Sequence, residues 1–301
     1  MTEKQSTTNS SSLVSVIMPC YNDGRYIMEA IQSVKDQSWK EIELIVIDDG
    51  SDEEETIQAL TKIEFPRMQI LHTDHIGPAA ARNKGIEAAM GEYIFPLDAD
   101  DLINPEYIGR AVQVLNENPN TGIVYCHADL FGEQSGKWDL PDYDFKTELL
   151  DNHIFVTAMF RRADWETVGG FCEELKAGME DYDFWLSLLG LGREVHQFQE
   201  TYFHYRIKRV SRTTHFQDNY QDVQDTYVQL YYRHKDLFQK HMDDYCLALR
   251  WNLIDQLMQN RQRAVQIEQL QAEIQELKSK ETQPTPSQSS LLRRIYHKIV
   301  K

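Results

Sequence analysis

The sequence predicts an α/β fold in which helices cover both faces of a mainly parallel sheet, with a helical extension at the C-terminal end. Short apolar runs rich in β-branched residues alternate with amphipathic helical segments from residue 13 to residue 131. The run at 42–48 is almost continuously apolar, which is typical of a strand covered on both sides. Polar, acid-rich segments follow three of the strands, and parallel sheets bind ligands at that edge.

Five strands and four helices make up the alternating part. The strands are expected at 13–18, 42–48, 68–73, 92–97 and 122–131. The helices are expected at 24–37, about 53–63, 77–90 and 104–118. Ile27, Ala30, Ile31 and Val34 share one face of the first helix, as a helix packed on a sheet requires.

Beyond residue 135 the pattern is less regular. A strand at 153–162 is expected to lead into a short helix, followed by a helix at 178–192 and a strand at 201–208. From about residue 217 the chain is helical and rich in glutamine. This part contains a short coiled-coil seam with 3-4-3 spacing, formed by Ile267, Leu270, Ile274 and Leu277.

Composition excludes several classes of protein. The chain has 301 residues and a formal net charge of −17, which argues against nucleic acid as a partner. No apolar run approaches the ~18 residues of a transmembrane helix, and the polar N-terminal segment does not resemble a signal peptide. Four cysteines without metal-binding spacing are expected to be reduced thiols. We therefore expect a cytoplasmic protein.

The segment "FPLDADD" at 95–101 ends the fourth strand with three carboxylates. Asp98 and Asp100, two positions apart beyond a strand, can direct both carboxylates toward one hard cation such as Mg²⁺ or Mn²⁺. Taken alone, the segment is also typical of a capped turn. An EF-hand is excluded because the required glycine and glutamate are missing, and a phosphatase nucleophile is disfavoured because these acids follow the fourth strand rather than the first.

Two further polar segments follow the first two strands: "PCYNDG" and "IDDGS". At the end of the second strand, the carboxylate of Asp48 or Asp49 suits a nucleobase N–H or a ribose hydroxyl. The structural alternative is an Asx-turn in which Gly50 supplies the bend. The chain contains neither G-x-G-x-x-G nor G-x-x-x-x-G-K-[ST]. Rossmann dinucleotide binding and P-loop chemistry are therefore disfavoured.

The chain resembles the inverting family 2 glycosyltransferases with the GT-A fold in four segments that have the family's order and spacing: "VSVIMPCYNDGRYIMEAIQSVKDQSW", "ELIVIDDGSDEE", "GPAAARNKGIEAAMGEYIFPLDADD" and "MEDYDFWLSLL". The resemblance covers roughly residues 13–212. It implies transfer of a sugar from a nucleotide-sugar to a hydroxyl acceptor, with a divalent cation, Mn²⁺ or Mg²⁺, as cofactor.

The resemblance also implies roles for individual residues. The nucleotide-sugar would be bound by Pro19, Tyr21, Asp49, Arg82, Asp98 and Lys208. Asp100 would be the principal metal ligand with Asp98 beside it, and Asp101 would be a turn or capping residue.

The acceptor side is implied by "GMEDYDFW". In an inverting transfer an acceptor hydroxyl attacks the anomeric carbon while a nucleoside diphosphate leaves, so the hydroxyl needs a base and the diphosphate a cation. The resemblance assigns the base to Asp181 and an acceptor contact to Glu180. The alternative is that these acids, in the first turn of a helix, only complement the helix dipole. Trp185 either stacks on an acceptor sugar or packs into the core.

One position departs from the family pattern. Many members carry a histidine in a "YRxHxxS"-like stretch after the last strand, and "YRIKRVSRT" has Lys208 there. A protonated lysine is not a comparable metal ligand, but it can neutralise phosphates. Lys208, Arg209 and Arg212 are therefore expected to form a cationic lid.

The predicted domain plan has five parts. These are a disordered tail (1–12), a GT-A domain (13–215) with a nucleotide-sugar half (13–131) and an acceptor half (132–215), a helical extension with a possible short coiled coil (216–280), a linker (281–290) and a basic amphipathic helix (291–301). The helical extension suits self-association. The last helix suits an anionic membrane surface, on the inner face of the plasma membrane, or a protein partner.

The sequence therefore predicts a metal-dependent, inverting glycosyltransferase. The expected donor is a UDP- or dTDP-sugar, and the expected acceptor is a glycan or lipid-linked glycan in the synthesis of a bacterial surface polysaccharide. Two alternatives remain: a catalytically inactive nucleotide-sugar-binding scaffold and a sugar nucleotidylyltransferase. The second would need a glycine-rich loop after the first strand, which "PCYNDG" does not supply.

Overall fold

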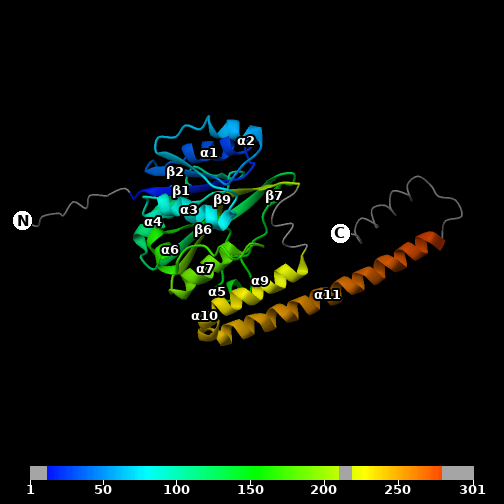
Figure 1. Ribbon diagram of the computed structural model, residues 1–301. Helices are drawn as coiled ribbons and strands as arrows, with labels where there is room; N and C mark the ends of the chain where they lie inside the picture. Colours follow the sequence, from blue (N-terminus) through cyan, green and yellow to red (C-terminus); the bar gives the residue numbers. More distant parts are fainter. Residues whose placement is uncertain (1–11, 210–218, 280–301) are drawn as a thin grey trace, which may run out of the picture. The chain divides into compact units, whose positions relative to one another are not determined.

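The computed structural model describes residues 12–209 and 219–279 and forms two compact units, Met1–His241 and Met242–Lys301. In the first unit the strands are β1 (Val14–Cys20), β2 (Ile42–Asp48), β3 (Met68–His72), β4 (Tyr93–Pro96), β5 (Leu102–Ile103), β6 (Thr121–Gly132), β7 (Gly136–Lys137), β8 (Met159–Arg161) and β9 (Glu194–Ile207) (Figure 1). Its helices are α1 (Ile27–Lys35), α2 (Glu54–Leu60), α3 (Pro78–Ala88), α4 (Tyr107–Glu117), α5 (Phe145–Glu148), α6 (Arg162–Val168), α7 (Glu180–Gly190), α9 (Tyr220–Arg233) and α10 (Lys235–Lys240).

One sheet runs through the first unit in the order β3-β2-β1-β4-β8-β6-β9-β5, and β7 pairs with β6. The pairs among β3, β2, β1 and β4 are all parallel, as the alternating sequence pattern predicts. β8 runs antiparallel to both of its neighbours, and β5 runs antiparallel to β9. Strands β1 to β4 thus pair in parallel with one another, and each antiparallel pair includes at least one of the strands β5 to β9. The pair of β6 and β9 is parallel.

The central strands are buried on both faces. All seven residues of β2 are buried, and six of seven in β1. Because successive side chains of a strand point to opposite faces, this burial means that both faces of the sheet are covered. On one face α3 approaches closely: a Cβ added to Gly85 would lie 2.6 Å from Ile47 and 2.8 Å from Ile17.

The strand expected at 153–162 is much shorter than predicted. The structure has a strand at Met159–Arg161, and the preceding residues form a loop. Ile154 is fully buried in that loop, and its carbonyl accepts from the indole N–H of Trp185 at 2.8 Å. The apolar run is therefore buried by loop packing rather than by sheet pairing, which local periodicity cannot distinguish.

The second unit contributes one long helix, α11 (Met242–Ser279). It includes the predicted seam, in which Ile267 is exposed and Leu270, Ile274 and Leu277 are partly exposed. The predicted linker and basic amphipathic helix lie outside the described residues. Within the described part of the chain, no helix combines the length and apolarity needed to cross a bilayer.

The four cysteines are free thiols, as expected from their spacing. Three of them, Cys20, Cys126 and Cys172, are buried, and Cys246 on α11 is exposed.

Candidate active site

The three polar segments of the sequence meet at one edge of the sheet. β2, β1 and β4 are adjacent and parallel, with Cys20 level with Asp48 at their carboxyl ends. The loops that follow these strands therefore lie side by side. The alternation of strands and helices in the sequence predicted polar loops at the carboxyl edge, and the structure adds that these three strands are neighbours.

The loop after β1 is fixed to the loop after β2 by Asn22, which has a left-handed backbone (φ 57°). Its side-chain oxygen accepts from the backbone N–H groups of Asp52 (3.0 Å) and Glu53 (3.1 Å), and its amide nitrogen donates to Asp52 at 2.8 Å. Gly24 packs against α2 so closely that an added Cβ would lie 2.3 Å from the Cα of Thr56. This loop therefore holds Asp23 in a fixed place.

Asp49 is buried and holds the loop between β3 and α3. Its carboxylate accepts from the N–H groups of Ile76 (2.7 Å) and Gly77 (2.9 Å) and from the hydroxyl of Thr73 (2.7 Å). Three donors for one carboxylate satisfy a charge that would otherwise be costly to bury. The structural role of Asp49 is thus plain in the geometry, and its contact with a nucleobase stays a prediction.

Tyr21 lies beside this loop and is 43% exposed. Its ring is 4.0 Å from the ring of His75, with an angle of 34° between the planes. His75 is exposed and has a left-handed backbone (φ 54°). The two rings form an open aromatic surface, and His75 also contacts the backbone carbonyl of Asp49. Pro19 is half-buried in β1, in register with Ile47 of β2.

The acids of "DADD" each have a different partner. Asp98 accepts from Arg82 at 2.7 Å, and Asp100 from Lys208 at 2.7 Å. Asp101 is buried, and its carboxylate accepts from the backbone N–H of Arg206 at 2.8 Å. Asp101 thus attaches the end of β9 to the turn.

Asp98 and Asp100 suit a hard divalent cation. Burial raises the pKa of Asp100, and the charge of Lys208 lowers it. The negative charges of Asp98 and Asp23 also raise the pKa of Asp100, because these carboxylates lie close enough to repel it. In the described residues no group of three or more His, Cys, Asp or Glu is arranged to hold a metal ion. A site with two carboxylates fits Mg²⁺ or Mn²⁺, which complete their shells with water and substrate phosphates.

Arg82 joins the two halves of the site. It is buried on α3, and its guanidinium donates to Asp98 at 2.7 Å and to Glu180, the first residue of α7, at 3.0 Å. Burial alone would lower the pKa of Arg82, but these carboxylates raise it above its usual value. A buried arginine without such partners would be costly, so the bridge is a strong constraint on the distance between α3 and α7.

Asp181 lies next to this bridge, partly exposed in the first turn of α7. Burial of the carboxylate and the charge of Glu180 raise the pKa of Asp181 to about 7, while Arg82, the N–H of Tyr182 and the side chain of Asn152 lower it. The Tyr182 N–H donates to Asp181 at 2.8 Å. A carboxylate with a pKa near neutrality can take up a proton during a reaction and release it afterwards.

Trp185 does not contact an acceptor. It is fully buried, and its ring packs against Phe160 and Phe184 in the core. The acceptor-binding role predicted for Trp185 is therefore wrong. Trp185 lies one turn beyond Asp181 on the same face of α7, and at that turn this face is buried in the core.

Three residues near the site were not predicted individually. Asp23 and His75 lie in segments where polar residues crowd together, so a residue-by-residue reading of those loops would have found them. Asn152 had no such signal, because it comes from a loop far from α7 in sequence. Of the predicted cationic lid, Lys208 is paired with carboxylates and Arg209 is exposed, whereas Arg212 lies outside the described residues.

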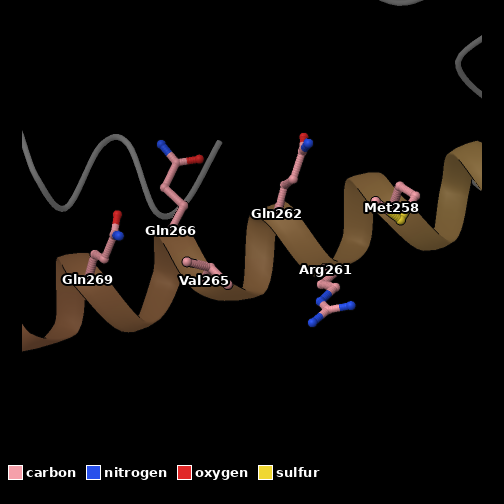
Figure 2. A pocket seen from close by; sticks show the side chains of 6 residues that line it. All are labelled: Met258, Arg261, Gln262, Val265, Gln266 and Gln269. Carbon is pink, nitrogen blue, oxygen red and sulfur yellow. The ribbon is translucent and has the colours of Figure 1, made fainter.

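A hollow on α11 does not have the features of a reaction site. It is lined by Met258, Arg261, Gln262, Val265, Gln266 and Gln269 (Figure 2). The three glutamine side chains extend to one side of the helix and Arg261 to the other. Among the described residues that line it, none is a carboxylate or a nucleophile, so these residues offer no groups for acid–base or covalent chemistry.

Comparison with known proteins identifies relatives of the first unit. The family model "Glycosyl transferase family 2" matches residues 15–174, more than half of the chain. An uncharacterized glycosyltransferase of Rickettsia typhi is 35% identical over 192 residues, which cover 60% of this chain and 59% of that protein. The uncharacterized glycosyltransferase YibD of Escherichia coli is 33% identical over 163 residues, covering 54% of this chain and 45% of that protein.

A solved structure has the same fold. The crystal structure of S. aureus TarS 1–349 in complex with UDP superimposes with a TM-score of 0.55 and 25% sequence identity, and the match covers 65% of this chain and 61% of that one. The match thus spans about three fifths of the solved chain. The predicted GT-A fold with C-terminal helices is confirmed.

Proposed function

This chain belongs to glycosyltransferase family 2, and from that premise we propose that it transfers a sugar from a UDP- or dTDP-sugar to a hydroxyl acceptor with inversion at the anomeric carbon. One observation carries the proposal. Arg82 binds both Asp98, in the acidic turn after β4, and Glu180, the neighbour of Asp181. The acids expected to serve the donor and the acceptor therefore lie within reach of a single side chain.

The donor nucleotide would lie over the loops after β1 and β2. The exposed Tyr21 and His75 rings offer a stacking surface for a base, and Asp49 retains a lone pair for a base N–H or a ribose hydroxyl. Pro19 and Arg82 would border the nucleotide-sugar. The UDP bound by the related S. aureus structure supports a uridine donor here.

Asp98 and Asp100 would hold a divalent cation, Mn²⁺ or Mg²⁺. Such a cation stabilises the negative charge that develops on a departing diphosphate. Lys208, at the end of β9, would add a second positive charge for the same group.

Asp181 would be the base that accepts the proton of the attacking hydroxyl. Its pKa, raised to about 7, suits this role, because such a carboxylate can take up and release a proton near neutral pH. Asn152 and the N–H of Tyr182 would hold the carboxylate in place, and Glu180 would border the acceptor. A catalytically inactive scaffold would not need a base of this pKa beside an acidic turn.

We further propose a glycan or lipid-linked glycan as acceptor, in the synthesis of a bacterial surface polysaccharide. Uncharacterized glycosyltransferases of bacteria are among the relatives, which supports a bacterial glycan. We also propose that the protein is located at the inner face of the plasma membrane and is attached through residues 291–301. These residues lie outside the described part of the chain.

Heat stability in the presence of nucleotides tests the donor and metal assignments. A panel of nucleoside diphosphates and nucleotide-sugars with Mn²⁺ or Mg²⁺ is expected to give the largest rise in melting temperature with uridine or thymidine nucleotides. Asp100→Ala is expected to abolish the Mn²⁺-dependent part of that rise, because a principal ligand is lost.

Asp236→Ala removes an exposed carboxylate from α10 and serves as the matched control. It is expected to retain the full Mn²⁺-dependent protection. Equal protection of the Asp100→Ala variant would remove Asp100 from the metal site, and protection by no nucleotide at all would end the proposed function.

A further inference from the structure

Lys208 bridges two loops of the active site. Its Nζ lies 2.7 Å from Oδ2 of Asp100 and 2.9 Å from Oδ1 of Asp23. The ammonium thus stands between the acidic turn after β4 and the loop after β1, next to the oxygen expected to bind a cation. The side chains of Lys208, Asp23 and Asp100 are 28%, 19% and 13% exposed, so solvent screens these pairs only in part.

The end of β9 is anchored independently of this ammonium. Arg206 donates its backbone N–H to Asp101 (2.8 Å), its Nε to the carbonyl of Asp100 (2.7 Å) and an Nη to Glu29 (2.7 Å). Its guanidinium also lies 4.4 Å and 4.3 Å from the ring centres of Tyr26 and Phe131. The backbone of the strand end therefore does not depend on where the Lys208 side chain points.

Lys208 itself is held by its two ion pairs and a longer contact of 5.9 Å with the ring of Tyr26. Its flexible four-carbon stem can carry the ammonium away from Asp100 by rotamer changes alone. Departure would leave Asp23 and Asp100 without their shared counter-ion. The ammonium and a divalent cation thus have the same electrostatic task at this site.

A divalent cation at the Asp100 carboxylate would lie close to the ammonium on Oδ2, and like charges so close repel strongly. Binding of the cation therefore favours displacement of the ammonium. A displaced ammonium gains a new partner when a diphosphate is present, since phosphate oxygens accept hydrogen bonds from lysine and carry negative charge. A neutral side chain at position 208 would not compete in this way.

We propose that Lys208 is an internal counter-ion that a divalent cation displaces from Asp100 and that then binds the diphosphate, so that cation and nucleotide bind cooperatively. The inference rests on the proposed function and adds a positioning residue to it. By linkage, each ligand raises the affinity of the other by the same factor.

Binding of Mn²⁺ to the full chain, followed by the electron paramagnetic resonance signal of free Mn²⁺ with and without UDP, tests the proposal. In the wild type UDP is expected to tighten Mn²⁺ binding by roughly 5- to 150-fold, the usual range of such coupling. Lys208→Met is expected to bind Mn²⁺ alone about tenfold more tightly than the wild type, and UDP is expected to tighten its Mn²⁺ binding less.

Two variants separate charge from packing. Lys208→Arg keeps the positive charge and is expected to bind Mn²⁺ like the wild type. Lys84→Met removes a lysine from an exposed position on α3 and is expected to leave Mn²⁺ binding unchanged. If Lys208→Met fails to fold, Lys208→Gln provides a second neutral side chain for the same measurement.

The outcomes distinguish this inference from the proposed function. Mn²⁺ affinity that is unchanged or weaker in the neutral variants would overturn the counter-ion role while leaving the transferase proposal in place. A wild type that binds neither UDP nor Mn²⁺ in the presence of UDP would overturn both.

Discussion

At the scale of single residues, Asp181 has the environment of a general base. The pKa of this carboxyl is raised to about 7 by burial and by Glu180, against the opposing effects of Arg82, Tyr182 and Asn152. A carboxyl with a raised pKa is protonated below that value and cannot accept a proton there. The environment of Asp181 thus predicts a reaction that depends on pH near neutrality.

We expect kcat/KM of transfer to fall as the pH drops below about 7, approaching a tenfold loss for each further unit. Release of nucleoside diphosphate, measured from pH 5 to pH 9 with an acceptor glycan, reports this profile. Asn152→Ala is expected to shift the acid limb to higher pH, because the hydrogen bond from Asn152 favours the ionised form.

Asp181→Asn is expected to lose transfer by roughly 10²- to 10⁴-fold while binding the donor normally, the effect of removing a general base. Asp236→Asn makes the same change at an exposed site on α10 and is expected to be fully active. Substantial turnover by Asp181→Asn would exclude Asp181 as the base.

At the scale of elements, successive turns of α7 have different tasks. Its first turn carries Glu180 and Asp181 at the site, and one turn later Trp185 is fully buried with its N–H bonded to the carbonyl of Ile154. The same helix is also held by residues near the C-terminal end of the first unit. Asp183 accepts from Arg233 at 2.7 Å and from His234 at 2.8 Å at the junction of α9 and α10.

Trp185→Ala is expected to destabilise the protein by about 3–5 kcal/mol, because it leaves a cavity in the core and an unpaired carbonyl. Urea unfolding followed by far-ultraviolet circular dichroism measures the loss. Tyr232→Ala removes a large ring from an exposed position on α9 and is expected to change stability by less than about 0.5 kcal/mol. A stable Trp185→Ala variant with a raised KM for the acceptor would restore the predicted sugar contact.

The sequence predicted the elements of the alternating half well and the later ones less well. Parallel strands buried on both faces leave long apolar runs, and amphipathic helices leave a 3.6-residue period, so both are visible locally. The run at 153–162 is equally apolar, yet most of it is a buried loop. Burial by loop packing and burial by strand pairing look the same in sequence.

At the scale of the whole molecule, α11 carries many exposed apolar side chains. Those of Leu247, Trp251, Leu253, Leu257 and Met258 are between 50% and 65% exposed. A 38-residue helix is unusual with so much apolar surface uncovered, and surfaces of this kind mark sites of association. This exposure supports the predicted self-association through the C-terminal helices.

We expect the full chain to sediment as an oligomer and a chain ending at His241 to sediment as a monomer at the same concentration. Both are expected to bind UDP, because the site residues all belong to the first unit. Leu257→Glu, a point change on α11, is expected to weaken association without truncation. A full chain that stays monomeric up to high micromolar concentration would exclude this role for α11.

The sequence by itself determined the order of strands and helices, the three polar loops at one sheet edge and the acidic turn of Asp98 and Asp100. These features follow from local periodicity and from the rule that parallel strands share their carboxyl edge. The tertiary structure alone decided which charges pair. Arg82 meets Glu180 across 98 residues, and Lys208 meets Asp23 across 185. Packing and the cost of burying an unpaired charge decide which residues pair over such distances in the sequence. No local sequence pattern indicates either of these two factors.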